Sequence, residues 1–171
     1  MRQETKSGRN LVPLFQGKKH VTDWEAKSGV KGYRPYQLFV DLGATKGRKA
    51  RVTAAICYDA TDLKLAADLR DKSDCLVVAS LNRDTNTFDT MATALQYHMY
   101  QPVILANSGQ YGGSTAQAPY AEQYHRLIAH LHGADQVGVS IFELDMLAFR
   151  EMRTKPSEKR RKTPPAGFSG R

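Results

Sequence analysis

The sequence predicts an α/β fold built on a mixed sheet. Two continuous apolar runs, 75–80 (Cys-Leu-Val-Val-Ala-Ser) and 102–107 (Pro-Val-Ile-Leu-Ala-Asn), have the composition of strands that are buried on both faces. Between them, residues 87–99 place apolar side chains three and four positions apart, which is the spacing of an amphipathic helix. An order of strand, helix and strand indicates helices that pack over a sheet.

The rest of the chain supplies further elements around this pattern. Residues 37–42 and 50–57 predict two strands of a hairpin, joined by a turn rich in glycine and lysine. Asp59 and Asp62 are candidate N-caps of a helix over 63–72. The other expected elements are, in chain order, a polar arm at 1–10, a short apolar run at 11–15, a polar loop at 17–36, a loop at 108–113, strands at 126–131 and 137–144, and a short helix at 145–152.

Composition limits the class of protein. A chain of 171 residues with 41% hydrophobic and 25% charged residues has the composition of one globular domain. No run approaches about 18 apolar residues and no apolar stretch follows a basic start, so we expect no membrane span, no secretory signal and a cytoplasmic location. Two cysteines, Cys57 and Cys75, are too few for a disulfide framework and lack the CxxC spacing of a structural metal site.

The formal net charge of +8 is concentrated near the C-terminus. Residues 150–171 carry eight Lys and Arg against two Glu, a net +6, and the other seventeen basic and fifteen acidic residues leave +2 for the body. Residues 159–162 (Lys-Arg-Arg-Lys) and the following prolines show no apolar periodicity. We therefore expect a basic disordered tail over 153–171, which either keeps the protein soluble or makes weak nucleic-acid contacts through phosphates.

The two cysteines have different contexts. Cys57 ends an apolar strand and precedes a helix, so its sulfur is expected at the carboxyl edge of the sheet, near the positive end of a helix dipole. This is where α/β proteins place reactive groups, although a buried cysteine that packs as a small hydrophobe is the alternative. Cys75 opens the buried run 75–80 and is interpreted as a core residue.

Residues 54–59 (Ala-Ala-Ile-Cys-Tyr-Asp) resemble the nucleophile segment of the nitrilase superfamily of carbon-nitrogen hydrolases, in which such a strand end is followed by a helix. Residues 17–21 (Gly-Lys-Lys-His-Val) are similar to the Lys-x-His-Leu segment of that family, and Lys18 precedes Cys57 by 39 residues. The later elements, ending in Glu-Leu-Asp at 143–145, also follow the family's order. The resemblance implies a nitrilase-like α-β-β-α sandwich with mixed sheets, N-terminally truncated, with a partial carbon-nitrogen hydrolase domain at 1–152.

A cysteine thiolate is a strong nucleophile, and a nearby ammonium group lowers its pKa and stabilises the oxyanion that forms when an amide or nitrile carbon is attacked. Lys18 is the expected cation and Lys19 a bystander, with a solvated basic loop as the alternative. By resemblance, Glu25 is a second acid beside the lysine, or else a rim carboxylate paired with Lys27. The backbone N–H of Tyr58 would be the second oxyanion donor.

One part of the family's machinery has no match. The general-base Glu of the family lies well upstream of the lysine, and here only Glu4 precedes Lys18, within a polar arm that does not match the base segment. After the cysteine, residues 61–63 (Thr-Asp-Leu) replace the Phe-Pro-Glu of many members. Sequences of this kind also occur fused behind bacterial reverse transcriptases, so we consider the chain a candidate for the detached C-terminal part of such a protein.

We therefore expect a thiol amidohydrolase that acts on small amides or nitriles through Cys57 and is incomplete on its own. The alternatives are an inactive nitrilase-like assembly module and a nucleic-acid-associated domain of a reverse-transcriptase system. No cofactor or metal is expected, because His130 and His132 share a strand face as an exposed pair without a third ligand. Missing strands would leave a sheet edge or apolar face uncovered, which predicts a homo-oligomer or pairing with a complementary N-terminal segment.

Overall fold

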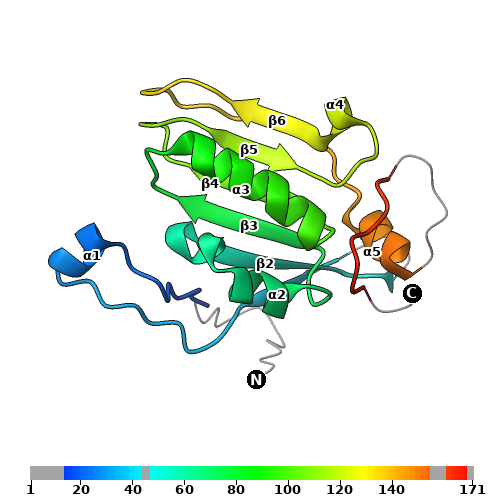
Figure 1. Ribbon diagram of the computed structural model, residues 1–171, viewed down its shortest axis with the longest axis horizontal. Helices are drawn as coiled ribbons and strands as arrows, with labels where there is room; N and C mark the ends of the chain where they lie inside the picture. The colour runs from blue at the N-terminus through cyan, green and yellow to red at the C-terminus, as the bar shows by residue number, and fades with distance from the viewer. Residues whose placement is uncertain (1–13, 44–46, 155–160, 169–171) are drawn as a thin grey trace, which may run out of the picture.

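A computed structural model describes residues 14–43, 47–154 and 161–168, and its centre is a six-stranded mixed sheet (Figure 1). The strands lie side by side in chain order and comprise β1 Phe39–Leu42, β2 Ala50–Ile56, β3 Cys75–Ser80, β4 Val103–Asn107, β5 Ser114–Gln117 and β6 Leu127–Leu131. The central strands β2, β3 and β4 are parallel, whereas β1, β5 and β6 join the sheet antiparallel. The predicted α/β class with a mixed sheet is confirmed.

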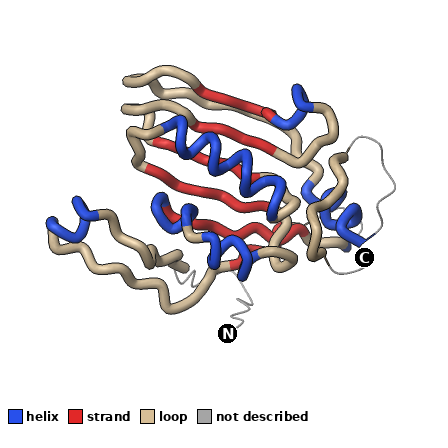
Figure 2. The backbone as a smooth tube through the Cα atoms, viewed as in Figure 1, coloured by secondary structure: helices blue, strands red, loops and turns tan. Residues whose placement is uncertain are grey.

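Two helices cover one face of this sheet. In Figures 1 and 2, α2 and α3 both lie on the face turned toward the viewer. The helical elements are α1 Asp23–Lys27, the 3₁₀ turn η2 Cys57–Thr61, α2 Leu63–Leu69, α3 Thr85–His98, α4 Gln123–Arg126 and α5 Met146–Thr154. The side chain of Asp62 caps α2 by accepting the backbone N–H of Lys64 at 2.9 Å. Within the described ranges, no helix has the length and apolar character that crossing a membrane requires.

The main core fills the space between the sheet and these helices. Leu65 of α2 and Phe88 and Leu95 of α3 are buried against Leu76 and Val78 of β3. Phe88 and Leu95 are seven positions apart and therefore lie on one face of α3, as the apolar spacing of the sequence predicts. The helix layer is thus held against the sheet by a continuous apolar contact.

The opposite side of the sheet, which we call the open face, carries the alternate strand residues. Ile56, Ala79 and Ala106 pair in register across β2, β3 and β4, and the two alanines are exposed. Val77 and Ile104, one row further in, are only partly covered. A strand buried on both faces has a second layer over it, so this apolar row indicates a partly uncovered sheet.

Most predicted elements are confirmed to within a few residues, and the run at 75–80 matches β3 in full. The predicted strand over 137–144 is wrong, because these residues form no β-ladder in the described part of the chain. The sequence reasoning also missed β5 and α1, since four- and five-residue elements contain too few positions to show a period. Residues 1–13, which include Glu4 and most of the predicted N-terminal arm, lie outside the described residues.

The predicted disordered tail over 153–171 is wrong for residues 161–168, which pack against the body. Phe168 is 3% exposed within a second apolar cluster, and the backbone N–H of Lys162 donates to Pro119 O at 3.0 Å. The error arose because an irregular segment that docks through backbone hydrogen bonds and one aromatic ring has no periodicity to detect. The predicted boundary at 152 also falls inside α5.

Candidate active site

Cys57 lies at the turn between β2 and η2. Its backbone has φ of 48°, in the left-handed region that a side chain with a Cβ seldom adopts. Such strain persists only where the surrounding structure enforces it, and it is common at functional sites. The Cys57 thiol is partly exposed, and the Oγ of Ser80 at the end of β3 lies 3.7 Å from its sulfur.

The parallel register brings the ends of three strands to this position. Because Ile56 pairs with Ala79 and Ala79 with Ala106, the next residue of each strand lies at the same carboxyl edge of the sheet. Asn107 fixes the loops at this edge, since its amide nitrogen donates to Asn82 O at 2.8 Å and to Gly112 O at 2.7 Å. The edge is therefore a rigid platform beside Cys57.

Lys18 and Glu25 form a tight ion pair. The ammonium nitrogen of Lys18 lies 2.5 Å from each carboxylate oxygen of Glu25, and the two side chains are only 15% and 22% exposed. Glu25 is also the third residue of α1 and completes a capping box with Thr22, whose N–H and hydroxyl donate to it at 2.7 and 2.9 Å. These bonds, that of Lys18 foremost, lower the pKa of Glu25, so the group is a carboxylate at neutral pH.

Asp59 attaches the Lys18 segment to the cysteine turn. This fully buried carboxylate accepts the backbone N–H groups of Lys19 at 2.9 Å and of His20 at 2.6 Å, with the guanidinium of Arg34 at 3.5 Å. A buried carboxylate is stable only with such donors, so the clamp joins two segments 40 residues apart in the chain. Asp59 is therefore not the N-cap that the sequence suggested, a role that Asp62 alone performs.

The predicted site residues thus fall into two adjoining groups. Cys57 and Tyr58 begin η2, and Lys18 and Glu25 belong to the loop that Asp59 binds to η2. As the second residue of a helical turn, Tyr58 has a backbone N–H without an intrahelical acceptor, which is what an oxyanion donor requires. The alternative pairing of Glu25 with Lys27 is not observed, because Lys18 occupies the carboxylate.

Sequence reasoning missed several residues that hold this site together. For all of them except Arg34, the one sequence signal is position, either at or just after the end of a buried strand or within the cysteine segment. They are Arg34, Asp59, Ser80, Asn82 and Asn107. The contacts that give these residues their roles join separate loops, and a local sequence pattern does not predict such contacts.

The two thiols have different environments. Cys75 is buried in β3, and burial, reinforced by the charge of Asp74, raises the pKa of its thiol to about 12. A thiol with this pKa is protonated at neutral pH and unreactive. The interpretation of Cys75 as a core residue is therefore confirmed, and Cys57 is the more accessible sulfur.

The histidine pair lies elsewhere. His130 of β6 is nearly buried, and its Nε2 lies 3.1 Å from Asp89 of α3, so the prediction of an exposed pair is wrong for this residue. Its Nδ1 contacts Nε2 of His132. The strand face was inferred correctly, but the helix that covers it could not be seen in the local sequence. Within the residues that the structure describes, no three His, Cys, Asp or Glu side chains converge as a metal site.

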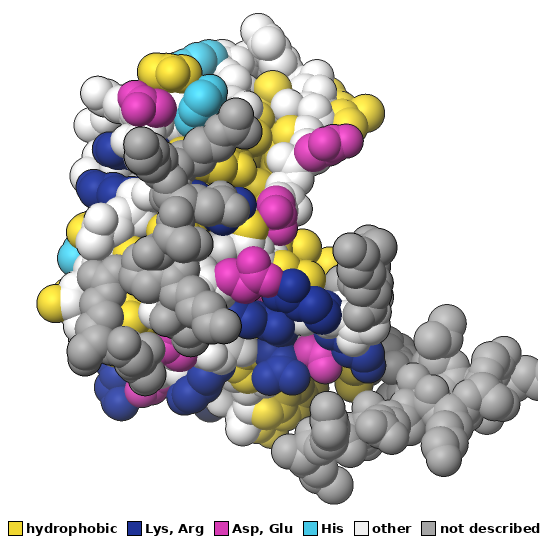
Figure 3. Space-filling view, turned by 90° about the vertical axis from the view of Figure 1, so that its right-hand side faces the viewer, with side chains coloured by type: hydrophobic (Ala, Val, Ile, Leu, Met, Phe, Trp, Pro, Cys, Tyr) yellow, Lys and Arg dark blue, Asp and Glu magenta, His cyan; other side chains and the backbone are white. Residues whose placement is uncertain are grey.

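Basic side chains gather around α5, where acidic groups interleave with them (Figure 3). Most of the arginines there form ion pairs. The pairs are Arg48 with Glu151, Arg150 with Asp74, Arg153 with Asp71, and Arg161 with Asp145. Arginines used in this way are less available to phosphates, which weakens the case for a nucleic-acid surface on this side.

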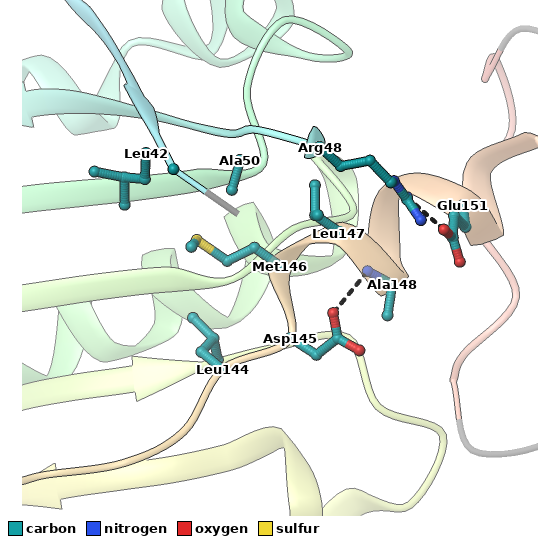
Figure 4. A pocket seen from close by; sticks show the side chains of 10 residues that line it. Leu42, Arg48, Ala50, Leu144, Asp145, Met146, Leu147, Ala148 and Glu151 are labelled. Atoms are coloured by element: carbon teal, nitrogen blue, oxygen red, sulfur yellow. Dashed lines mark hydrogen bonds and ion pairs between the residues drawn. The ribbon is translucent and has the colours of Figure 1, made fainter. Parts of the chain in front are cut away.

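A hollow of about 440 Å³ opens far from Cys57, at the opposite end of β2 (Figure 4). Leu42 and Ala50 line one side of it, and Leu144, Met146 and Leu147 line the other. Because Ala50 starts β2 and Cys57 follows its end, this hollow cannot present a substrate to the thiol.

No protein-family model matches the sequence, and no curated protein matches it. Solved structures do. The chain is similar to XC1258 from Xanthomonas campestris, a CN-hydrolase superfamily protein with an arsenic adduct in its active site, at 15% identity and a TM-score of 0.57 over 80% of this chain and 54% of that one. Nit3 of Saccharomyces cerevisiae, a member of branch 10 of the nitrilase superfamily, gives 16% identity and a TM-score of 0.59 over 80% and 49%.

An amidase mutant from Nesterenkonia sp. AN1, which carries an acetamide moiety on its active-site cysteine, is similar at 18% identity and a TM-score of 0.50, over 67% of this chain and 44% of that one. The chain therefore has the fold of nitrilase-superfamily proteins. It spans about half the length of the proteins that it matches. One sheet with helices on one face is what half of an α-β-β-α sandwich contains, so the predicted truncated sandwich is confirmed.

Proposed function

We propose that this chain carries the nucleophile half of a thiol amidohydrolase site, which acts on the amide or nitrile carbon of a small molecule through Cys57. One observation carries the proposal: a strained cysteine turn at the carboxyl edge of the parallel strands is clamped through Asp59 to a segment that holds a partly buried Lys18–Glu25 pair. Neither the strain nor the buried charges stabilise the fold by themselves, and both are typical of catalytic sites.

For an amide, the reaction follows from this arrangement. The Cys57 thiolate bonds to the carbonyl carbon, and the C=O electron pair moves to oxygen, where Lys18 and the N–H of Tyr58 stabilise the oxyanion. The C–N bond then breaks and nitrogen leaves as ammonia or an amine after taking up a proton, which gives a thioester. Water adds to the thioester and releases the carboxylic acid and the free thiol.

Glu25 acts on this chemistry through Lys18. Its lowered pKa and its three donors make it a poor proton acceptor, so we assign it as a positioning residue that holds the ammonium group in place. The base that deprotonates Cys57 and activates water then comes from a complementary segment, in keeping with a chain that spans half of its structural neighbours. The same segment would cover the open face of the sheet.

Two other functions are weaker candidates. An inactive assembly module would have the same fold, but it would have no need for the strain at Cys57 or for the Lys18–Glu25 pair. A nucleic-acid-associated domain is disfavoured, because the described arginines near α5 are engaged in ion pairs. A cytoplasmic location stays a prediction.

The test begins with the thiols. We expect iodoacetamide to label Cys57 at neutral pH while Cys75 stays unlabelled in the folded chain, because the pKa of Cys75 is about 12. Lys18→Met should slow the labelling of Cys57 at neutral pH, and Lys27→Met, at the end of α1, is the matched control. Equal labelling of both cysteines, or a response to Lys27 as large as that to Lys18, would contradict the assignment.

The second step measures turnover. Ammonia release from a panel of small amides is assayed with the chain alone, with an added N-terminal segment of a nitrilase-superfamily amidase, and with Cys57→Ala in both settings. We expect turnover that depends on Cys57 only when the segment is present, since loss of a general base costs about 10²- to 10⁴-fold. Turnover by the chain alone would show that a carboxylate within it is the base. No turnover in either setting would favour the inactive module.

A further inference from the structure

Residues 137–144 have the character of a strand without being one. They follow β6, and Val137, Val139 and Ile141 alternate with smaller or inward-facing residues. The last backbone bonds before them are donated by Asp135 to Gln110 O and by Gln136 to Gly109 O. From 137 to 144, no backbone N–H or C=O bonds to any described residue. This row of free donors and acceptors is what an edge strand presents to a partner.

The side chains of this segment have two distinct environments. Val137, Val139 and Ile141 are 99%, 84% and 95% exposed. On the other side, Phe142 is partly covered, and the backbone of Gly138 lies against the side chain of Leu131. Three β-branched residues in one outward row are the residues that strands favour, and soluble surfaces seldom expose such a row unless something covers it.

The segment ends at the hollow of Figure 4. Leu144 lines that hollow together with Met146 and Leu147, the first two residues of α5, and Leu42 and Ala50 line it from the strands β1 and β2. A chain that paired with 137–144 would therefore arrive beside a hollow of about 440 Å³, whose lining includes Arg48, Asp145 and Glu151 as well as apolar side chains and which is large enough for a bulky side chain. Edge and hollow form one continuous surface.

Charge distinguishes between the possible occupants. Acidic groups flank the uncharged stretch 137–142 on both sides, with Asp135 before it and Glu143 after it, and both are exposed. In an antiparallel pair of two copies, these acids would lie near one another at each end, which is unfavourable. A strand with basic ends would instead place opposite charges in register, so a different chain fits this edge better than a second copy.

We propose that residues 137–144 accept a β-strand from a partner chain, one with alternating β-branched residues, basic flanks and a bulky apolar side chain that enters the hollow. The inference rests on the proposed function in one respect, because the partner is taken to be the chain that supplies the complementary half of the site. The inference adds the place at which that partner chain binds, which is the edge formed by residues 137–144. Binding can be measured without turnover, so the two proposals fail independently.

The probe is a fluorescent peptide, acetyl-Lys-Thr-Val-Thr-Ile-Thr-Val-Lys-Phe-amide, titrated into the full chain and followed by anisotropy and amide hydrogen exchange. We expect saturable binding with new protection at alternate amides of 137–144. Val139→Pro removes one donor and fixes φ, and it should weaken binding about tenfold or more. Val139→Thr, which keeps the backbone donor and strand propensity, is the matched control and should bind within about threefold. Unchanged circular dichroism shows that both variants fold.

Three results would overturn the proposal. The first is the absence of saturable binding, and the second is binding that Val139→Pro leaves unchanged. The third is a concentration-dependent dimer, seen by light scattering, in which 137–144 is already protected, because a second copy would then be the occupant. A peptide with Glu in place of both Lys tests the charge argument and should bind more weakly at low salt. Labelling of Cys57 should not respond to the peptide, whatever becomes of the proposed catalysis.

Discussion

Replacing Asp59 by alanine should release the loop that carries Lys18 from the cysteine turn. Asp59 is fully buried, and its carboxylate receives the N–H groups of Lys19 and His20 and the guanidinium of Arg34. A hydrogen bond to a charged acceptor contributes about 1.5–3 kcal/mol, so the two amide bonds represent about 3–6 kcal/mol at most. The amides need not stay buried and unpaired, because the loop can open to water instead.

The loss should therefore appear first as local opening and only partly as global destabilisation. We expect the amides of Lys19 and His20 in Asp59→Ala to exchange with solvent about a hundredfold faster, which corresponds to about 3 kcal/mol. Under the proposed function, labelling of Cys57 at neutral pH should slow in the same variant, because the clamp no longer holds the Lys18 segment against the cysteine turn.

The assay is amide hydrogen exchange read by NMR, with thermal unfolding measured in parallel. Asp68→Ala is the matched control, since Asp68 lies exposed on α2 and pairs only loosely with Lys64, at 3.3 Å. This surface change should stay within about 0.5 kcal/mol of the parent chain. Unchanged exchange at Lys19 and His20 in Asp59→Ala would refute the clamp, as would an equal response in the control.

Three further predictions concern other parts of the molecule. Because the Lys18 contact lowers the pKa of Glu25, the stabilisation by this carboxylate is present above its unfolded pKa of 4.5 and is lost as the pH falls from 4.5 through its folded pKa. Hydrogen exchange of the Thr22 amide should therefore rise over that acidic range in the parent chain. A flat pH profile identical to that of Glu25→Gln would contradict this prediction. Phe168→Ala should cost up to about 3–5 kcal/mol, measured by denaturant unfolding, because the ring is buried against Tyr100, and an unchanged midpoint would mean that the segment does not dock in solution. Cys57→Gly should be more stable than Cys57→Ala by about 1 kcal/mol, since only glycine adopts φ of 48° without strain, and equal denaturant midpoints would show that the turn is not strained.

The strained backbone of Cys57 belongs to the proposed active site, and this explains why this part of the chain is not optimised for stability. A glycine at position 57 would relieve the turn, but it would remove the nucleophile. Asp59 is a buried charge and the Lys18–Glu25 pair is partly buried, and a wholly structural loop would avoid the cost of desolvating them. Stability lost at such positions is the usual accompaniment of a reactive site.

Elements with strong local signals could be predicted from the sequence alone. The apolar run of β3 and the period of α3 each need only neighbours in the chain to be recognised, because burial imposes that spacing on any sheet with helices over it. The segment around Cys57 was also visible locally, since a strand end, a cysteine and an acid lie within a few residues. Lys18 and Glu25 could be named from the same chain and placed side by side by resemblance, but only the structure excludes the alternative pairing of Glu25 with Lys27.

Which of these residues meet depends on the three-dimensional fold. Asp59 looked like a helix cap and proved to be the acceptor that joins segments 40 residues apart, because its partners are backbone amides that every residue has. Val137 and its neighbours have a strand pattern, yet they pair with no strand in the described part of the chain, because the pattern specifies faces and not a partner. Periodicity shows on which face of its own helix or strand a residue lies, and it does not identify contacts with other elements. Hydrogen bonds between loops, the docking of Phe168 and the absence of a pairing strand depend on the rest of the fold.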